Sequence, residues 1–309
     1  MSKKVICYIA ADLNDTASLR KLRKFTTRAT EKGFSVAAIW PGFSWFLKSE
    51  DWKLDFFKLF RPEDFCAVVV DCEFGFQSEV LEKQAEIMKE MNLPLVVLDM
   101  EVPGANCVVF DDEPVFEQLL EHLVTVHHAH DIMFAADGGY PNKIERYLNV
   151  YKEFLKKENI PFDENRVCTT DTVFSVNIEN IIRSVRMKKP DAIISSSSNL
   201  GVGVNNAVSA CGYSVPGDIV VAGINTLSNR RAGIPDLSSA ARNLTLQSDK
   251  CLELIEKAIA EKKYDPVVRI PMDMHLSESC GCAKPEKGDY TDLVRDILLQ
   301  RNLAVSQER

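Results

Sequence analysis

The sequence lacks any apolar run that approaches the roughly 18 residues of a membrane-spanning helix. It also lacks a surplus of positive charge, since 37 Lys and Arg residues face 45 Asp and Glu residues, for a net charge of −8. A protein that binds DNA on its own usually carries a basic patch or stripe. We therefore expect this chain to contact neither a membrane nor nucleic acid directly.

Sequence motifs of several enzyme classes are also missing. There is no Walker loop, and no Gly-x-Ser-x-Gly elbow that would expose a nucleophilic serine. Gly201-Val-Gly203 follows an apolar run, but Asn206 stands where a dinucleotide-binding loop needs a third small residue, so close helix packing explains these glycines better. The serine run 195–198 has no base assigned by spacing and indicates a hydrogen-bonding loop. We expect no catalysis and no cofactor.

Metal-binding spacings are incomplete in the sequence. His127-His128-Ala-His130 has no acidic or cysteine pair close by in the chain. Cys280-Gly-Cys282 has no second Cys or His pair at the spacing of a zinc site. We therefore expect surface or capping histidines, a structural role for the two cysteines, and no metal.

The cysteines and the first residues bear on the compartment. The nine cysteines are odd in number and mostly lie inside apolar runs, which favours reduced, buried thiols in a cytoplasmic protein. Lys3 and Lys4 followed by the apolar residues 5–11 could begin a signal peptide, but that run is only just long enough. We interpret residues 5–11 as the first β-strand.

What the sequence does have is a regular alternation of strand and helix patterns. The length suits two domains of about 150 residues, and 46% hydrophobic with 27% charged residues is typical of globular proteins. Short apolar runs predict strands at 5–11, 34–39, 67–71, 94–99, 108–110, 132–136, 166–169, 191–195, 218–223 and 267–272. Helical spacing predicts helices at 16–32, 77–92, 112–126, 143–159, 175–187, 199–211 and 246–263.

This alternation predicts an α/β protein with parallel sheets covered on both faces. One sheet of about nine strands would satisfy the pattern, but the restart after residue 110 favours two doubly wound lobes. Ligands of such sheets bind at the carboxyl ends of the strands. The polar loops at those ends are therefore the candidate binding residues, and a cleft between two lobes would place them face to face.

The last 33 residues, from position 277 onward, have a different character. Residues 277–289 contain Pro285 and Gly288 and little apolar content, so they indicate a linker. Residues 290–304 follow with apolar residues at helical spacing, including Leu293, Ile297 and Leu298. We expect an amphipathic helix that dimerises or passes a signal onward, although a frayed chain end is the alternative.

The second half resembles a known family. The segments Pro190-Asp-Ala-Ile-Ile, Ser195–Gly203 and Gly212-Tyr-Ser-Val-Pro-Gly-Asp through Gly223-Ile-Asn225 are similar to the LacI/GalR sensor domain. Val109-Phe-Asp-Asp112 resembles the crossing into that family's second lobe, and Glu145-Arg146 its helix after the ligand loop. The resemblance covers about residues 4–282 and implies the type I periplasmic-binding-protein fold, with two lobes joined by three crossings around a small-molecule site.

The resemblance also implies how the chain is divided. The first lobe would comprise residues 1–109 and 244–264, and the second residues 110–243 and 265–282. Residues 283–309 would be a linker with a connector helix. The family's helix-turn-helix would precede the first strand, whereas Val5 already lies in that strand, so we expect no DNA reader here.

Two departures concern ligand specificity. Ser197-Ser198 replaces an Asn-Asp pair of the family, and Asn225 replaces its usual aspartate. The helix of Arg146 carries an extra residue, and a surface salt bridge is the alternative role for this arginine. The ligand-binding residues expected from position and resemblance are Asp12, Asn14, Trp40, Phe74, Arg146, Phe174, Ser197 and Asn225. Asp12, Asn14, Arg146 and Asn225 would form hydrogen bonds, and Trp40, Phe74 or Phe174 would stack on a sugar or nucleoside.

The segment Leu276–Cys282 is similar to the close of LacI-like sensor domains fused to other outputs. Such relatives often continue into a GGDEF diguanylate cyclase, and sometimes into an AraC-type or kinase module. The sequence thus predicts a cytoplasmic, homodimeric small-molecule sensor of a bacterial signalling or transcription regulator, in which ligand-driven lobe closure passes to a C-terminal output of diguanylate cyclase type. The alternatives are a solute-binding protein for sugar uptake, the sensor of an AraC-type regulator, an enzyme on the same architecture and a protein-interaction module.

Overall fold

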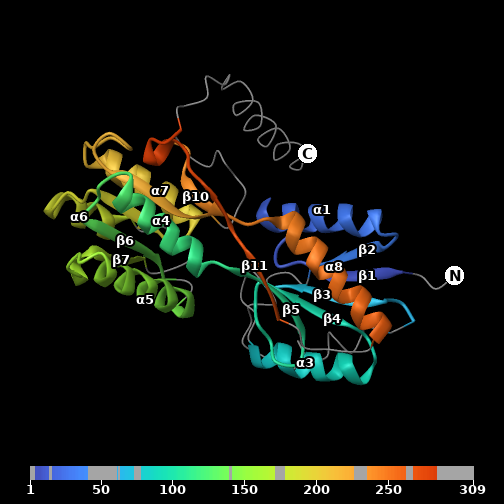
Figure 1. The fold of residues 1–309 in the computed structure, drawn as a ribbon. Coiled ribbons are helices and arrows are strands. Elements are labelled where there is room, and N and C mark those ends of the chain that lie inside the picture. The colour runs from blue at the N-terminus through green and yellow to red at the C-terminus, as the bar shows by residue number, and fades with distance from the viewer. Residues whose placement is uncertain are drawn as a thin grey trace, which may run out of the picture.

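The structure is a computed structural model that describes residues 4–13, 16–40, 61, 63–72, 78–138, 141–170, 178–225, 235–261 and 267–283. Figure 1 shows two α/β lobes side by side. The predicted connector helix and most of the predicted linker lie outside the described residues. Among the described helices, none combines the length and the apolar character of a membrane span.

The first lobe is built on a six-stranded parallel sheet in the order β11-β5-β4-β3-β1-β2. Its strands are β1 Val5–Ile9, β2 Ser35–Ile39, β3 Ala67–Asp71, β4 Leu95–Leu98, β5 Asn106–Asp111 and β11 Val267–Pro271. Its helices are α1 Thr16–Glu31, α3 Ser78–Glu90 and α8 Leu244–Glu261. The strand β1 lies between β3 and β2, which confirms residues 5–9 as a strand of the sheet.

The second lobe has its own six-stranded sheet, in the order β12-β10-β9-β8-β6-β7. Its strands are β6 Ile132–Asp137, β7 Val167–Thr170, β8 Ala192–Ser195, β9 Val220–Asn225, β10 Ser238–Ala241 and β12 Asp273–His275. Its helices are α4 Glu113–Thr125, α5 Pro141–Lys157, α6 Glu179–Met187 and α7 Ser198–Ala210, with 3-10 turns at Glu164–Arg166 and Glu278–Cys280. All pairings are parallel except that of β12 with β10. The prediction of two doubly wound lobes is therefore confirmed, and the alternative of a single large sheet is wrong.

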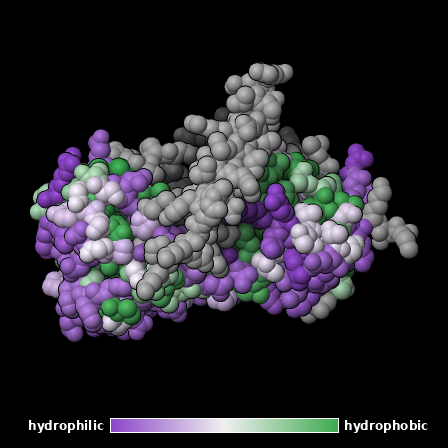
Figure 2. All heavy atoms as spheres, turned by 90° about the horizontal axis from the view of Figure 1, so that it is seen from above, coloured by the Kyte–Doolittle hydropathy of each residue, from purple (hydrophilic) through white to green (hydrophobic). Residues whose placement is uncertain are grey.

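Alternating side chains explain why both faces of each sheet are covered. In β1, Ile6 and Tyr8 pack in one core with α1 and α8, whereas Cys7 and Ile9 pack in another with α3. In β6, Phe134 faces α4 and α5, and Met133 faces α6 and α7. Figure 2 accordingly shows mainly hydrophilic side chains over the outer parts of both lobes, with small apolar patches among them.

The segment 265–282 differs from the predicted division. It was expected in the second lobe, but Val267–Pro271 pairs with β5 in the first sheet, and only from Asp273 does the chain pair in the second. The predicted single strand 267–272 is thus two strands in different sheets, separated at Met272. Strand pairing joins residues more than 150 positions apart, so the local pattern did not indicate which sheet receives them.

Three crossings connect the lobes: β5 to α4, β10 to α8 and β11 to β12. The chain leaves the first sheet at the carboxyl end of β5 and the second at the carboxyl end of β10. Because β4 runs parallel to β5, and β9 runs parallel to β10, each of these crossings leaves from the edge where the carboxyl ends of those neighbours also lie. The carboxyl edges of the two sheets therefore face each other at the junction (Figure 1).

A buried ion cluster lies at the carboxyl edge of the first sheet. The Lys21 ammonium, with only 4% of its side chain exposed, is 2.5 Å from a carboxylate oxygen of Asp71 and also pairs with Asp99. The Tyr8 hydroxyl donates to Asp71 at 3.3 Å, and the Gln247 amide donates to Asp99 at 2.9 Å. Since α1, β1, β3, α8 and the residue that follows β4 each supply a member, the cluster joins five elements where the junction begins.

Opposing effects set the pKa of Asp99. Burial alone would raise it, but the positive charges of Lys21 and Arg242 and two hydrogen bonds lower it below its usual value. A carboxyl whose pKa is lowered by folding stabilises the native state above its unfolded-state pKa of about 4. That contribution is lost as the pH falls through the lowered value.

Close packing in the second sheet requires a glycine at position 223. A Cβ built there would lie 2.0 Å from Ser195 Oγ and 2.9 Å from the Ser195 backbone oxygen, directly across the strand pair. The predicted packing role of Gly201 is confirmed, because a Cβ there would lie 2.6 Å from Leu237 Cδ2.

Gly223→Ala is expected to lower the free energy of unfolding by about 1–3 kcal/mol, because the backbone of β8 or β9 must shift. Urea unfolding measures the change. Gly217→Ala is the matched control, since its Cβ would meet only the Ser214 side chain in an exposed turn. Equal stability of the two variants would contradict the packing argument.

Lys21→Met is expected to lower the free energy of unfolding at pH 7 by roughly 3–5 kcal/mol, because it leaves two buried carboxylates without their cation. Burial then raises the pKa of Asp99, so the deficit against the parent shrinks as the pH falls toward 4. Urea unfolding at pH 7 and pH 4.5 tests both expectations, the loss of stability at pH 7 and the smaller loss at lower pH. Lys32→Met, which breaks the surface pair with Glu256, should change little at either pH; a pH-independent deficit for Lys21→Met would refute the charge argument.

Candidate functional site

The second lobe presents a polar cluster at its carboxyl edge. Asp137 ends β6, Thr170 ends β7, and Ser196 and Ser197 follow β8. Ser197 Oγ donates to Asp137 Oδ2 at 2.9 Å, and Ser196 Oγ accepts from the backbone N–H of Asp137 at 2.8 Å. The N–H of Gly138 donates to Thr170 Oγ1 at 3.4 Å. Neighbouring strands thus bring a carboxylate and three hydroxyls to one place.

Ser197 also shapes the start of α7. As the N-cap residue it has an extended backbone, and its hydroxyl accepts from the N–H of Leu200 at 3.4 Å. Its side chain is half-buried and joins the helix start to Asp137. The predicted hydrogen-bonding loop therefore holds the Asp137 carboxylate in a defined position.

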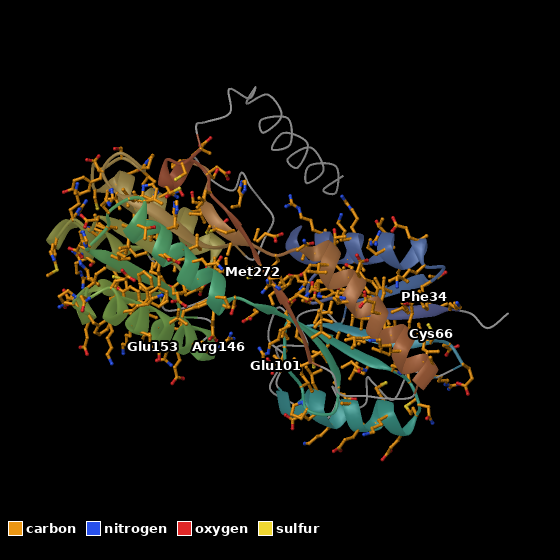
Figure 3. The ribbon with its side chains drawn as sticks, viewed as in Figure 1. Phe34, Cys66, Glu101, Arg146, Glu153 and Met272 are labelled. Atoms are coloured by element: carbon orange, nitrogen blue, oxygen red, sulfur yellow. The ribbon has the colours of Figure 1, made fainter. Side chains whose placement is uncertain are left out.

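Arg146, on α5, is joined to the first crossing. Its Nη2 donates to Asp112 Oδ1 at 2.9 Å, and its Nε donates to Glu113 Oε1 at 2.5 Å. Tyr147 OH donates to Asp112 Oδ2 at 2.6 Å, and burial followed by the Asp112 charge raises the pKa of Tyr147 well above its usual value. Figure 3 shows Arg146 on the side of the second lobe that faces the first, with Met272 between the lobes.

The Arg146 side chain is 47% exposed, so its ion pairs contribute little to stability by themselves. The structure therefore contains the surface salt bridges that were the alternative role for Arg146. A half-exposed guanidinium at the facing edge still has surface to offer a ligand.

Arg242, in the second crossing, was not among the predicted residues. Its guanidinium lies 5.2 Å from the ring centroid of Phe110, which is near the end of β5, just before the first crossing. Its Nη1 is 3.7 Å from a carboxylate oxygen of Asp99. One side chain therefore contacts the first crossing and the ion cluster of the first lobe. Arg242 comes directly after β10. The Ser-Ser-Ala-Ala sequence of β10 has no apolar run that would predict a strand, so the sequence did not indicate this position.

The predicted residues that the structure describes lie at the two facing edges. Asp12 follows β1 and Trp40 follows β2, and these strands are adjacent with Ile9 paired to Ile39. Ser197 follows β8, and Asn225 ends the neighbouring strand β9; only the backbone of Asn225 is described. Asn14, Phe74 and Phe174 lie outside the described residues.

Asp137, Thr170 and Asp99 each lie at the carboxyl end of a buried strand and begin one of the candidate polar loops, but they were not among the eight residues expected to bind the ligand. That position is the signal that could have found them. Among the described residues, the side chains that could together hold a metal ion lie elsewhere, near the other end of α4: His122, His127, Cys280 and Cys282.

Comparison with known proteins agrees with this geometry. The periplasmic binding protein-like domain family matches residues 120–280, a little over half of the chain. Catabolite control protein A of Staphylococcus xylosus is 25% identical over 209 residues, which are 66% of this chain and 62% of that protein. The chain thus spans less than two thirds of that relative's length.

Solved structures share the whole two-lobed fold. Transcription regulator CcpA of Lactococcus lactis superposes with a TM-score of 0.71 at 15% identity, covering 91% of this chain and 100% of that one. A LacI family transcriptional regulator from Enterococcus faecium with bound ribose gives a TM-score of 0.70 at 15% identity, with the same coverage. With the family match, the two sheets and the three crossings together, the chain belongs to the periplasmic binding protein-like domain family, and its two lobes share the fold of these transcription regulators.

Proposed function

We propose that the chain is the ligand-sensing part of a cytoplasmic regulator, which binds a small polyhydroxylated molecule such as a sugar or nucleoside without transforming it. The observation that carries the proposal is the pair of carboxyl edges that face each other across three crossings. Hydroxyls, carboxylates and a guanidinium gather along those edges, which suits a ligand with many hydrogen-bonding groups.

The proposed contacts come from both lobes. Asp12 and Asn14 of the first lobe, and Arg146, Ser197 and Asn225 of the second, would hydrogen-bond the ligand. Trp40, Phe74 or Phe174 would cover its apolar face. To these we add the carboxylate of Asp137, which already accepts one hydroxyl, from Ser197, and has further acceptor capacity for another. The ribose bound to the Enterococcus faecium regulator supports a ligand of this chemical class.

Signalling follows from contacts to both lobes. A ligand that touches both edges binds the closed arrangement more tightly than the open one, and so shifts the population toward closure. Residues at the crossings, such as Arg242 and Asp112, would change their environment as the lobes rotate. In a homodimer this rotation would alter the subunit arrangement, and the resemblance at 276–282 supports an output of diguanylate cyclase type after the connector.

Transcription regulation is the second candidate output. The relatives include a catabolite control protein and, from Rhizobium radiobacter, a lactose operon repressor that is 28% identical over 86 residues. Both candidates use the same ligand site and differ only in the module that the sensor controls.

Ser197→Ala and Asp137→Asn are expected to weaken ligand binding by about 10-fold or more, since each removes or neutralises a group at the second-lobe edge. Thermal shift against a panel of sugars and nucleosides identifies the ligand, because a molecule that binds the folded state raises the melting temperature. Titration calorimetry then measures each variant.

Ser214→Ala is the matched control, because Ser214 forms the same kind of bond, 2.6 Å to Asp218, in an exposed turn. It should bind like the parent. If all three variants keep parental affinity, the ligand does not use the Asp137 edge.

The double variant Arg146→Met with Asn225→Ala is expected to lose measurable binding, since two of the proposed hydrogen-bonding groups of the second lobe disappear. Calorimetry with the ligand found in the panel measures this. Arg28→Met, which removes a surface arginine paired with Asp249 on the first lobe, is the control and should bind normally. Unchanged affinity in the double variant would show that these two residues are wrongly assigned.

A further inference from the structure

Two motifs that are far apart in the sequence meet in the second lobe. The Nε2 atoms of His122 and His127 are 3.1 Å apart, and Cys282 Sγ lies 3.4 Å from each of them. With Cys280 Sγ, the four atoms all lie within 4.8 Å of one another. The sequence argument against a metal, that no second pair accompanies either motif, therefore fails in three dimensions.

These separations are close to those of a tetrahedral zinc site. Bonds of about 2.0 Å to nitrogen and about 2.3 Å to sulfur place two nitrogens about 3.3 Å apart and a nitrogen and a sulfur about 3.5 Å apart. Two sulfurs on one zinc ion are about 3.8 Å apart by the same geometry. Two thiolates and two imidazoles are also one of the common ligand sets of structural zinc.

Local structure explains how each pair converges. The helix α4 carries His122 in its last turn, and the backbone N–H of Val126 donates to the His122 carbonyl at 3.0 Å, so the chain turns and brings His127 back beside it. The 3-10 turn ends at Gly281, whose φ of 81° is left-handed, and this reversal directs Cys280 and Cys282 to the same side.

The cysteine segment is anchored by contacts other than the cluster. Ser279 Oγ donates to the Val221 carbonyl at 2.5 Å and accepts from the N–H of Ser238 at 2.8 Å. Cys280 and His122 are buried, whereas Cys282 is exposed. An ion could therefore reach the cluster from solvent, and a substitution at Cys282 need not unfold the lobe.

We propose that His122, His127, Cys280 and Cys282 form a structural site for one Zn²⁺ ion. The ion would fasten residue 282, which directly precedes the expected linker and connector at 283–309, to α4. This site is separate from the proposed ligand edge and does not depend on the identity of the ligand.

The test uses the full 309-residue chain, purified under reducing conditions, stripped with chelator and reloaded with Zn²⁺. We expect one zinc per chain by elemental analysis and a higher melting temperature that chelator reverses. Co²⁺ in place of Zn²⁺ should show the intense visible absorption of a tetrahedral ion and a thiolate-to-cobalt charge-transfer band.

Cys282→Ser and His127→Asn should each weaken metal binding by roughly 100-fold or more and remove the cobalt spectrum. His130→Asn, in the same histidine tract but outside the cluster, and Cys211→Ser, a partly exposed thiol on the same lobe, are the controls and should bind like the parent. The proposal is overturned by an octahedral cobalt spectrum, by a Cys280–Cys282 disulfide in the reduced preparation, or by stoichiometric zinc retained in both ligand variants.

Discussion

The direction of the strands is the constraint on which the rest of this structure depends. All strands of the first sheet run the same way, and in the second only β12 runs against its neighbour. The chain can pass between lobes only where strands end, so β5 and β10 deliver it from one carboxyl edge to the other. Polar residues at the carboxyl ends of buried strands, such as Asp137 and Asp99, are thereby placed at the junction whatever their distance in sequence.

Local patterns predicted most of the fold, because the central strands are short apolar runs that no surface element would have. The strands around Val68, Val96 and Ile193 are fully buried, and their sequences show it. The strand β10 escaped prediction because Ser238 and Ser239 are buried polar residues. Ser238 Oγ accepts from the N–H groups of Ser277 and Cys280, so a long-range hydrogen-bond partner replaces the apolar side chain that would have marked it.

The site was predictable in outline and not in detail for the same reason. The rule that ligands bind at carboxyl ends located the loops, including those of Asp12, Trp40 and Ser197. No local spacing relates Arg146 to Asp112, or Arg242 to Phe110, since those contacts arise only when separate elements pack. The ion cluster is a similar case: Lys21 lies in a helix with other basic residues, and only the fold shows that it alone is buried between two carboxylates.

The helix α4 relates the two proposed sites physically. Its first turn meets Asp112, which holds Arg146 and Tyr147 beside the first crossing, and its last turn carries His122. At 1.5 Å per residue, Asp112 and His122 are about 15 Å apart along the helix. Fastening Cys282 to His122 and His127 would make the start of the predicted linker rotate with the second lobe. A zinc ion there would therefore limit independent movement of the segment after Cys282 when the lobes close, as transmission to the proposed C-terminal output requires.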